Sequence, residues 1–462
     1  MIPLDDDEAW RRAKDFTALH RAQWSGTMGA DQLDEYQRMN LGRTLDHCRN
    51  GSPFYQARLS SVTSTTPFQA VPLTTKDDLR THLDDVPSLR LDESWVYYET
   101  TGTTGTSTPC PRNVDDSVRT AVALSESYRE LLAPYGRNLV FAVMGPTELH
   151  STGDTFGDVF RNLGHTSVKM WPHSPVVGMG RAAELLHRLQ VDAMVCTPGM
   201  AILLARYLSD HGMRPDSLGM SVIFTLGELA TPRLLEQIGR VWGTDVHSCM
   251  YASQEASVLA VPGPDGALRS TPLNYYYEMV DPSTGDLLDD RREEREGELV
   301  VTHLYQGAKP LVRYRTGDVV RARGVGQDFT VVPVGRVRDR IVVGGRDYSA
   351  FDFEVALLDG CPEFLDYQVT IDDRNGRDRL TVLFEAHEDA RCSGAQMDRY
   401  TEAVRRHFEV PVTVAWGRTD ERTSTGAMVS WKAARIRDLR SSGDGEARSS
   451  ETIAEQRAAR IA

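Results

Sequence analysis

Short apolar runs alternate with helix-like stretches between residues 138 and 250, and this alternation most constrains how the chain can fold. The runs cover residues 139–143, 193–196 and 221–224, and helical patterns such as 181–189 separate them. Strands that are buried on both faces read as continuous apolar runs, and parallel strands need a long crossover between them. The pattern therefore predicts an α/β fold built on a parallel sheet.

The second half of the chain has a different pattern, in which strand-like segments and turns predominate. Residues 275–280 and 297–302 read as strands, and the turn-forming residues 281–285 follow the first of them, which predicts a smaller antiparallel β region. Beyond Asp339, strand and helix patterns alternate up to about residue 408. These patterns predict a compact α+β unit of its own.

Composition narrows the classes of function. Of the 462 residues, 40% are hydrophobic and 26% are charged, as in ordinary globular proteins, and the net charge of -14 argues against a nucleic-acid surface. The chain starts without a signal-peptide pattern and has no apolar run long enough to span a membrane, so we expect a cytoplasmic protein. Its six cysteines include no Cys-x-x-Cys pair, so neither a disulfide framework nor a thiolate zinc site is expected.

A loop rich in threonine and glycine carries the first chemical signal. Residues 98–109 read Tyr-Glu-Thr-Thr-Gly-Thr-Thr-Gly-Thr-Ser-Thr-Pro, after a strand-like segment and before a helical one. Glycines let backbone N–H groups turn toward an anion, and hydroxyls add donors, so the loop can cradle a phosphate. It is not a Walker loop, because no Gly-Lys-Ser/Thr follows, and a flexible polar linker is the alternative.

Two carboxylates follow at positions suited to ligands. Glu255 comes directly after an apolar strand, where α/β sheets place ligands, and could hold Mg²⁺; the alternative is a solvated glutamate. Asp318 ends Val-Arg-Tyr-Arg-Thr-Gly-Asp and could accept two hydrogen bonds from a ribose diol, while Arg315 offers a fork to an anion; an ordinary β-turn is the alternative. The charged segment 335–345 connects the body of the chain to the C-terminal unit and suits a hinge.

Taken in order, these segments resemble the adenylate-forming superfamily, and specifically its phenylacetate-CoA ligase branch. Residues 72–79 (Pro-Leu-Thr-Thr-Lys-Asp-Asp-Leu) and 281–288 (Asp-Pro-Ser-Thr-Gly-Asp-Leu-Leu) extend the resemblance over nearly the whole chain. It implies a large N-terminal ATP- and acid-binding domain (residues 1–338) and a small mobile C-terminal domain (339–440). A polar tail (441–462) would follow.

The resemblance implies a reaction in two steps. A carboxylate attacks the α-phosphate of ATP to give an acyl adenylate and pyrophosphate, and a second substrate, CoA, then displaces AMP. A carboxylic acid with a pKa of about 4 is already ionised at neutral pH, so the first step needs no general base. The difficulty is the approach of an anion to a polyanion, which Mg²⁺, loop donors and a cation would relieve.

The same resemblance assigns residues to the nucleotide. The phosphates would be gripped by the loop residues Thr101, Gly102, Thr103, Thr104, Gly105 and Thr106. Glu255 would ligate Mg²⁺, and Asp318 would hold the ribose hydroxyls with help from Arg336. The adenine would be framed by Gly227, Glu228 and Tyr251.

The C-terminal part departs from the family pattern. Asp339 would be the pivot of the small domain, and Lys432 is assigned as the catalytic lysine because Lys-Ala-x-Arg-apolar fits the family better than Gly426-Ala427. The alternative for Lys432 is a surface lysine. The loop has Thr106 where the family has lysine, and Gly344 stands where many relatives carry a basic residue, which puts the usual second half-reaction in question.

The acid pocket is expected from two segments: Phe141, Val143, Met144, Glu148 and His150, with Thr197 and Pro198. Glu148, His150 and the nearby Asp154 would put polar groups near the ring, so we expect an amino- or hydroxy-substituted aromatic acid. The alternative is that these side chains face water.

Three functions stay open from the sequence. The first is a CoA ligase for a small aromatic acid. The second is a ligase with another acceptor or oxyanion, either an amide-forming enzyme or a diazotase-like relative that activates nitrite for an arylamine. The third is a nucleotide-binding protein without turnover. The partners would be a small acid and a nucleotide, with no nucleic acid and no membrane, and a homodimer is among the assemblies left open.

Overall fold

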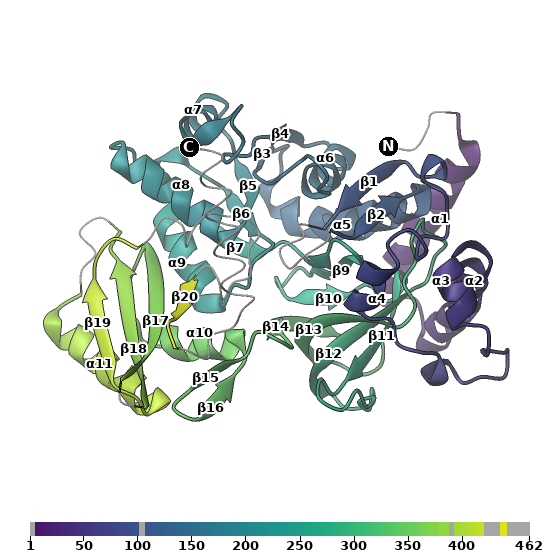
Figure 1. The fold of residues 1–462 in the computed structure, drawn as a ribbon. Helices are drawn as coiled ribbons and strands as arrows, with labels where there is room; N and C mark the ends of the chain where they lie inside the picture. The colour runs from purple at the N-terminus through teal and green to yellow at the C-terminus, as the bar shows by residue number, and fades with distance from the viewer. Residues whose placement is uncertain (1–4, 101–106, 375, 388–391, 420–434, 441–462) are drawn as a thin grey trace.

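The computed structural model describes residues 5–100, 107–374, 376–387, 392–419 and 435–440. Three β regions organise these residues: a parallel sheet, a larger antiparallel sheet and a C-terminal sheet (Figure 1). The mixed α/β fold predicted from the sequence is confirmed. No helix among the described residues is long and apolar enough to cross a membrane.

The parallel sheet has the strand order β4-β3-β5-β6-β7. Its strands are β3 (Val140–Val143), β4 (Thr166–Lys169), β5 (Ala193–Cys196), β6 (Val222–Thr225) and β7 (Asp245–Ser248), joined by α6 (Thr152–Asn162), α7 (Gly178–Arg188), α8 (Pro198–Asp210) and α9 (Pro232–Trp242). Alternate side chains of each strand enter two different cores. Phe141, Val195 and Phe224 pack with α5 (Val114–Leu132) and α6, and Ala142, Met194 and Ile223 pack with α7, α8 and α9.

The antiparallel sheet has the order β11-β12-β13-β14-β10-β9-β8. Its strands are β8 (Tyr251–Ser253), β9 (Ser257–Pro262), β10 (Leu268–Ser270), β11 (Tyr275–Val280), β12 (Glu294–His303), β13 (Tyr314–Arg323) and β14 (Thr330–Arg336). The predicted turn after β11 forms, because the Gly285 amide donates to the Asp281 carbonyl (2.8 Å). In the pairing of β13 with β14, Asp318 stands opposite Arg336.

Helices and one hairpin precede the parallel sheet. They are α1 (Asp7–Trp24), α2 (Ala30–Gly51), α3 (Pro53–Arg58), α4 (Lys76–Thr81) and α5 (Val114–Leu132), with the short 3₁₀ turns η1 (Phe68–Ala70), η2 (Leu91–Glu93), η3 (Ala133–Tyr135) and, later, η4 (Pro215–Leu218). Strands β1 (Val96–Glu99) and β2 (Pro109–Arg112) pair antiparallel on either side of the threonine-glycine loop. The helix after the loop begins at Val114, because the Asn113 side chain caps it by accepting from the Asp116 amide (3.1 Å).

The C-terminal sheet has the order β19-β18-β17-β20. The elements of this part are β15 (Ile341–Val343), β16 (Arg346–Tyr348), α10 (Ala350–Leu358), β17 (Asp366–Arg374), β18 (Arg377–Glu385), α11 (Gly394–Phe408), β19 (Val412–Trp416) and β20 (Ile436–Asp438). This part lies below α8 and α9 in Figure 1, and its apolar core is continuous with theirs. Asp339 lies between β14 and β15; the domain boundary drawn there from the sequence stays a prediction.

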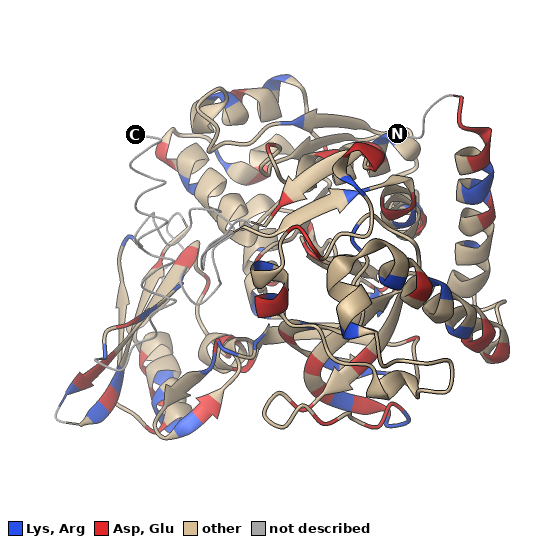
Figure 2. Ribbon diagram, turned by 45° about the vertical axis from the view of Figure 1, so that its right-hand side comes forward, with Lys and Arg blue, Asp and Glu red and all other residues tan. Residues whose placement is uncertain are grey.

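Charged residues of both signs are mixed over the described ribbon (Figure 2). Many form short-range pairs on exposed helices, such as Arg233 with Glu236 (2.7 Å) and Arg181 with Glu184 (2.6 Å). Exposed pairs of this kind contribute little to stability. The charges that bear on function are the buried ones described below.

Candidate active site

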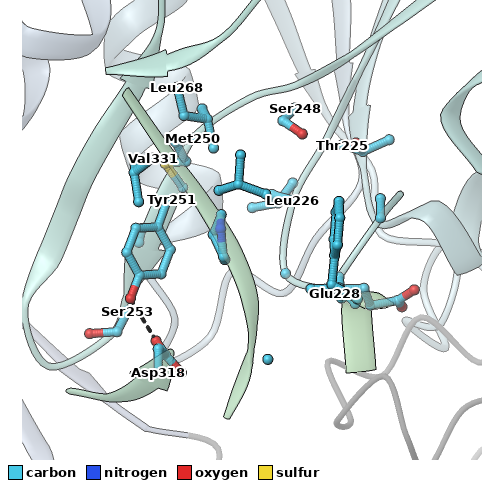
Figure 3. A pocket seen from close by; sticks show the side chains of 18 of the residues that line it. Thr225, Leu226, Glu228, Ser248, Met250, Tyr251, Ser253, Leu268, Asp318 and Val331 are labelled. Atoms are coloured by element: carbon cyan, nitrogen blue, oxygen red, sulfur yellow. Dashed lines mark hydrogen bonds between the residues drawn. The ribbon is translucent and has the colours of Figure 1, made fainter. Parts of the chain in front are cut away.

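A cavity of about 480 Å³ opens at the carboxyl ends of β6 and β7, where parallel sheets place their ligands (Figure 3). Three parts of the chain form its walls. The parallel sheet contributes Thr225 to Ala230 and Ser248, the antiparallel sheet contributes Tyr251, Asp318 and Arg336, and α10 contributes Ala350 and Phe351. The cavity therefore lies where the three β regions meet.

The residues predicted for the adenine and the ribose come together here. Tyr251 and Asp318 lie on one side of the cavity and Glu228 on the other (Figure 3). The Tyr251 hydroxyl donates a hydrogen bond to Asp318 Oδ2 (2.9 Å). Burial raises the pKa of Tyr251 well above its usual range, and the negative charge of Asp318 adds to this, so the hydroxyl keeps its proton and stays a donor.

Opposing effects act on the pKa of Asp318. Burial raises its pKa, while Arg336, whose Nε lies 3.7 Å from Asp318 Oδ1, and the Tyr251 hydroxyl favour the ionised form. A carboxylate with two oxygens at the edge of a cavity can accept hydrogen bonds from a vicinal diol. The arrangement is therefore suited to a ribose.

A second cavity of about 300 Å³ shares Asp318, Arg336, Asp339 and Ser253 with the first. Its remaining lining is dominated by charged residues: Lys76, Asp77, Arg80, Glu255, Glu298, Arg315 and Arg338. A space lined by several cations and buried carboxylates, next to a candidate ribose site, is suited to phosphates with a bound cation.

Glu255 is the buried carboxylate of this second cavity. Lys76 Nζ lies 3.1 Å from Glu255 Oε1. Burial acts to raise its pKa, yet Lys76 and Lys309 outweigh burial and lower it, so Glu255 is ionised. Mg²⁺ usually takes one or two carboxylates and completes its shell with phosphates and waters. A single ionised carboxylate beside a phosphate site fits that requirement.

Lys76 and Lys309 were not predicted as site residues. Lys76 is the first residue of α4, which begins with a capping box: the Asp78 amide donates to Thr75 Oγ1 (3.1 Å) and the Thr75 amide donates to Asp78 Oδ2 (2.8 Å). The preceding Thr74 is bonded to β13 through Arg313 and Arg315, which fixes α4 beside the cavity. The Thr-Lys-Asp-Asp sequence signals this helix start, although not its neighbours.

The central residues of the predicted phosphate loop, Thr101 to Thr106, lie outside the described residues. Both ends of the loop are tied together, because the Thr100 amide donates to the Thr108 carbonyl (3.1 Å) and the Thr108 amide donates to Thr100 Oγ1 (2.9 Å). At the end of the hairpin, buried Lys309 donates to the Pro109 carbonyl. The two ends of the loop therefore lie side by side.

The apolar residues predicted for the acid pocket lie elsewhere. Phe141 is fully buried and stacks on Phe160 with ring centroids 3.7 Å apart, and Val143 is in the same core. Met144 is buried in the core on the other side of the sheet. None of these three lines the 480 Å³ cavity as the described residues outline it. Phe141 and Val143 lie in the core because β3 is an interior strand with helices on both faces. A role for these residues in the acid pocket stays a prediction.

Thr197 and Pro198 begin a helix rather than line this cavity. The Thr197 hydroxyl accepts from the Met200 amide (3.0 Å) and caps α8, and Pro198 occupies the first helical position. Both are buried, and neither lines the 480 Å³ cavity in the described structure.

Of the three polar residues expected near the ring, only His150 lines the cavity. Glu148 is exposed, and Asp154 accepts from Tyr98 Oη (3.0 Å) and Lys169 Nζ (2.9 Å). His150 Nδ1 lies 3.3 Å from the Thr152 amide, which can only donate, so Nδ1 is the acceptor and Nε2 carries the proton. Burial lowers the pKa of His150 to about 4, so the ring is neutral at pH 7.

Two further polar residues, Ser151 and Gln254, line the cavity next to His150, and no motif in the sequence marks them as site residues. Ser151 Oγ donates to Gln254 Oε1 (3.1 Å), and the buried Gln254 Nε2 has no hydrogen-bond partner in the described part of the chain. A buried amide donor at a cavity wall is available to a ligand that carries an acceptor.

Two site residues were predicted in the C-terminal part, the hinge Asp339 and the catalytic Lys432. Asp339 lines both cavities, whereas Lys432 lies outside the described residues. Gly344 has φ +60° in the turn between β15 and β16, and a Cβ atom there would lie 2.3 Å from the Phe408 carbonyl oxygen. A side chain at position 344 is therefore incompatible with this packing.

Comparisons with known proteins agree with this geometry. No family model matches the chain. A phenylacetate-coenzyme A ligase of Pseudomonas putida is 25% identical over 355 residues, covering 72% of this chain and 77% of the relative. In fold, the chain is similar to 2-hydroxyisobutyryl-CoA ligase in its postadenylation state in complex with 2-HIB-AMP (TM-score 0.68, 18% identity, 93% of both chains). It is also similar to an acyl acid amido synthetase in complex with 2,4-DB (TM-score 0.63, 13% identity, 92% of this chain and 95% of that one).

Proposed function

Because the chain belongs to the phenylacetate-CoA ligase-like branch of the adenylate-forming superfamily, we propose that it activates a small aromatic carboxylic acid as its AMP ester and transfers the acyl group to CoA. As an ATP-dependent, AMP-forming ligase, the protein is an enzyme rather than a binding protein without turnover. One observation carries the proposal. Asp318 lines both a cavity large enough for a nucleoside and an acid and a second, charged cavity suited to phosphates.

In this proposal the chain's own residues bind and orient ATP. Asp318 accepts from the ribose hydroxyls, supported by Tyr251 and Arg336, and the adenine lies between Tyr251 and Glu228. Mg²⁺ on Glu255 would offset the charge of the phosphates. Lys76 adds a cation beside Glu255, and the loop sequence carries Thr106 instead of the lysine of the family pattern.

The substrate acid would carry a hydroxyl or amino substituent. His150 Nε2 and the Gln254 amide are donors on the cavity wall, and Ser151 lies beside them. A site built from buried donors binds poorly any ligand that leaves them unpaired. Both donors favour an oxygen acceptor, so a hydroxyl fits this wall better than an amino group, whose nitrogen is a weak acceptor on an aromatic ring.

A second candidate function uses another acceptor or oxyanion. The packing around Gly344 leaves no room for the basic residue that many relatives carry at this position. Its absence bears on the second half-reaction, the transfer to CoA. The alternative is therefore an amide-forming ligase, or a diazotase-like enzyme that activates nitrite for attack by an arylamine.

One experiment separates these functions. The purified protein is incubated with Mg-ATP and a panel of hydroxy-, amino- and unsubstituted aryl acids, with CoA, an amine or nitrite in separate wells, and pyrophosphate and product mass are measured. A thioester formed only with CoA supports the CoA ligase. Pyrophosphate release that requires nitrite or an amine supports the second candidate. A preference for the unsubstituted acid would contradict the proposed substituent.

A further inference from the structure

Arg435 is a buried cation between the C-terminal sheet and the 480 Å³ cavity. It immediately precedes β20, its side chain is fully buried, and its Nη1 lies 3.7 Å from Glu228 Oε2 while its Nε lies 3.8 Å from Asp366 Oδ1. The guanidinium also lies over the Tyr367 ring, 5.7 Å from its centroid. Glu228 lines the cavity, whereas Asp366 and Tyr367 belong to β17.

Two other arginines of the described residues form ion pairs that join these parts of the fold away from the cavity lining. Buried Arg206 of α8 pairs with Asp366 (3.0 Å) and Glu385 (2.7 Å), and at the surface Arg418 pairs with Asp210 (2.7 Å). Arg206 is therefore a buried ionic link between α8 and the C-terminal sheet, whereas the exposed pair of Arg418 contributes little. The contact of Arg435 with Glu228 adds a direct electrostatic link from that sheet to the proposed adenine site.

The link has a clear physical consequence for Glu228. Burial raises the pKa of this carboxyl, and the charge of Arg435 opposes the shift. Glu228 Oε2 also accepts from the Gly199 amide (3.1 Å), so its position depends on groups from both parts of the fold. Removing one partner of a buried charge pair leaves the other uncompensated, which costs more than the pair contributes.

We propose that Arg435 is a positioning residue for adenylate formation: it holds Glu228 in place on the cavity wall only while the C-terminal sheet is docked. In this arrangement α10 of the same part supplies Ala350 and Phe351 to the cavity wall, so the docked state is the one that encloses the acid and ATP. The proposal rests on the proposed function and adds a residue to which no role was assigned. When the sheet moves away for the second step, Glu228 loses this partner.

The test compares the two half-reactions in Arg435→Met, Arg435→Lys and a matched control, Arg418→Met. The first half-reaction is pyrophosphate release at saturating Mg-ATP and acid, and the second is acyl transfer from a chemically prepared adenylate to the acceptor found in the panel. We expect Arg435→Met to slow pyrophosphate release at least tenfold and to change transfer less than twofold. Arg435→Lys should recover part of the loss, and Arg418→Met should change neither rate.

A double-mutant cycle tests whether Arg435 acts through Glu228. Glu228→Gln will itself slow adenylate formation, but a neutral amide no longer needs a compensating cation. In that background, Arg435→Met should cause less than a threefold further loss. Additive losses, equal slowing of both half-reactions, or an unchanged rate in Arg435→Met would each overturn the proposal.

A measurement without turnover separates this proposal from the proposed function. If the wild-type protein releases no pyrophosphate with any acid or with nitrite, the proposed function fails, and the contact is then tested by hydrogen exchange. Arg435→Met should increase amide exchange in residues 197–201, which include the Gly199 donor to Glu228, whereas Arg418→Met should not. Equal exchange in the two variants would show that Arg435 does not position Glu228.

Discussion

The two walls of the 480 Å³ cavity are built on different principles. On the wall assigned to the nucleotide, Tyr251, Asp318 and Arg336 come from three strands and fix one another through a hydrogen bond and an ion pair. On the wall assigned to the acid, His150 and Ser151 stand where the loop after β3 enters α6. His150 bonds to its neighbour Thr152, and one side-chain bond joins Ser151 to Gln254. A wall fixed by interstrand pairs preserves its geometry when the sequence around it changes, whereas a loop wall can be remodelled for a new substrate.

The largest expected effect tests whether β3 belongs to the acid wall at all. Phe141→Ala should lower the free energy of unfolding by about 3–5 kcal/mol, because it removes a fully buried ring that stacks on Phe160. The KM for the acid should change little in whatever protein stays folded. Denaturant unfolding and acid titration measure the two quantities. A large rise in KM with unchanged stability would show that Phe141 contacts the acid. The acid wall would then include β3, and the contrast between the two walls drawn above would be wrong.

The next effect concerns the charged cavity that continues the nucleotide wall. Glu255→Gln should reduce pyrophosphate release by about 100- to 1000-fold, the loss typical of removing a group that stabilises transition-state charge. The fold should persist, because the amide keeps the shape of the side chain. Glu148→Gln, an exposed acid on the loop before His150, is the control and should leave the rate unchanged. Retained activity in Glu255→Gln would rule out a role for this carboxylate in holding Mg²⁺.

A smaller effect sharpens the assignment of the ribose. Asp318→Asn should lower kcat/KM for ATP about tenfold, the order expected when a charge-assisted hydrogen bond is lost. With 2′-deoxy-ATP, the same substitution should lower kcat/KM much less, because that nucleotide lacks one of the hydroxyls that Asp318 would hold. Equal losses with ATP and 2′-deoxy-ATP would mean that Asp318 acts on something other than the ribose diol.

The sequence predictions for the nucleotide wall and for the acid wall compare differently with the structure. Tyr251, Asp318, Arg336 and Glu228 line one cavity, and each lies in a short segment whose order along the chain resembles a known family; their roles stay predictions. Phe141 and Val143 lie in the core, as the continuous apolar run of β3 indicates, so their place in the acid pocket stays a prediction. Gln254 and Lys76 were missed, since their significance depends on partners more than 100 residues away in sequence.

The parallel sheet and the C-terminal unit were predictable for a different reason. The interior strands β3, β5 and β6 are short, apolar and separated by helical periods, so local patterns are enough to identify them. The edge strands β4 and β7 are more polar and carry no such signal. The contacts that join the two units are not local. Arg206 reaches Glu385 across 179 residues, and neither residue lies in a motif. Local patterns therefore predict elements well and the packing between elements poorly.

The smallest effect tests the acid wall through its one titratable group. Burial lowers the pKa of His150 to about 4 from its ordinary value of 6.5, so between these two values the unfolded chain binds more protons than the folded protein. The stability contributed by neutral His150 is therefore complete above pH 6.5 and is lost as the pH falls toward 4, by about 1 kcal/mol per pH unit. His150→Gln should flatten the dependence of unfolding free energy on pH between 6.5 and 5.5, whereas His211→Gln, at an exposed histidine, should not. If both variants keep the wild-type slope, His150 is charged or exposed in solution, and the acid wall offers a cation rather than a neutral donor to its substrate.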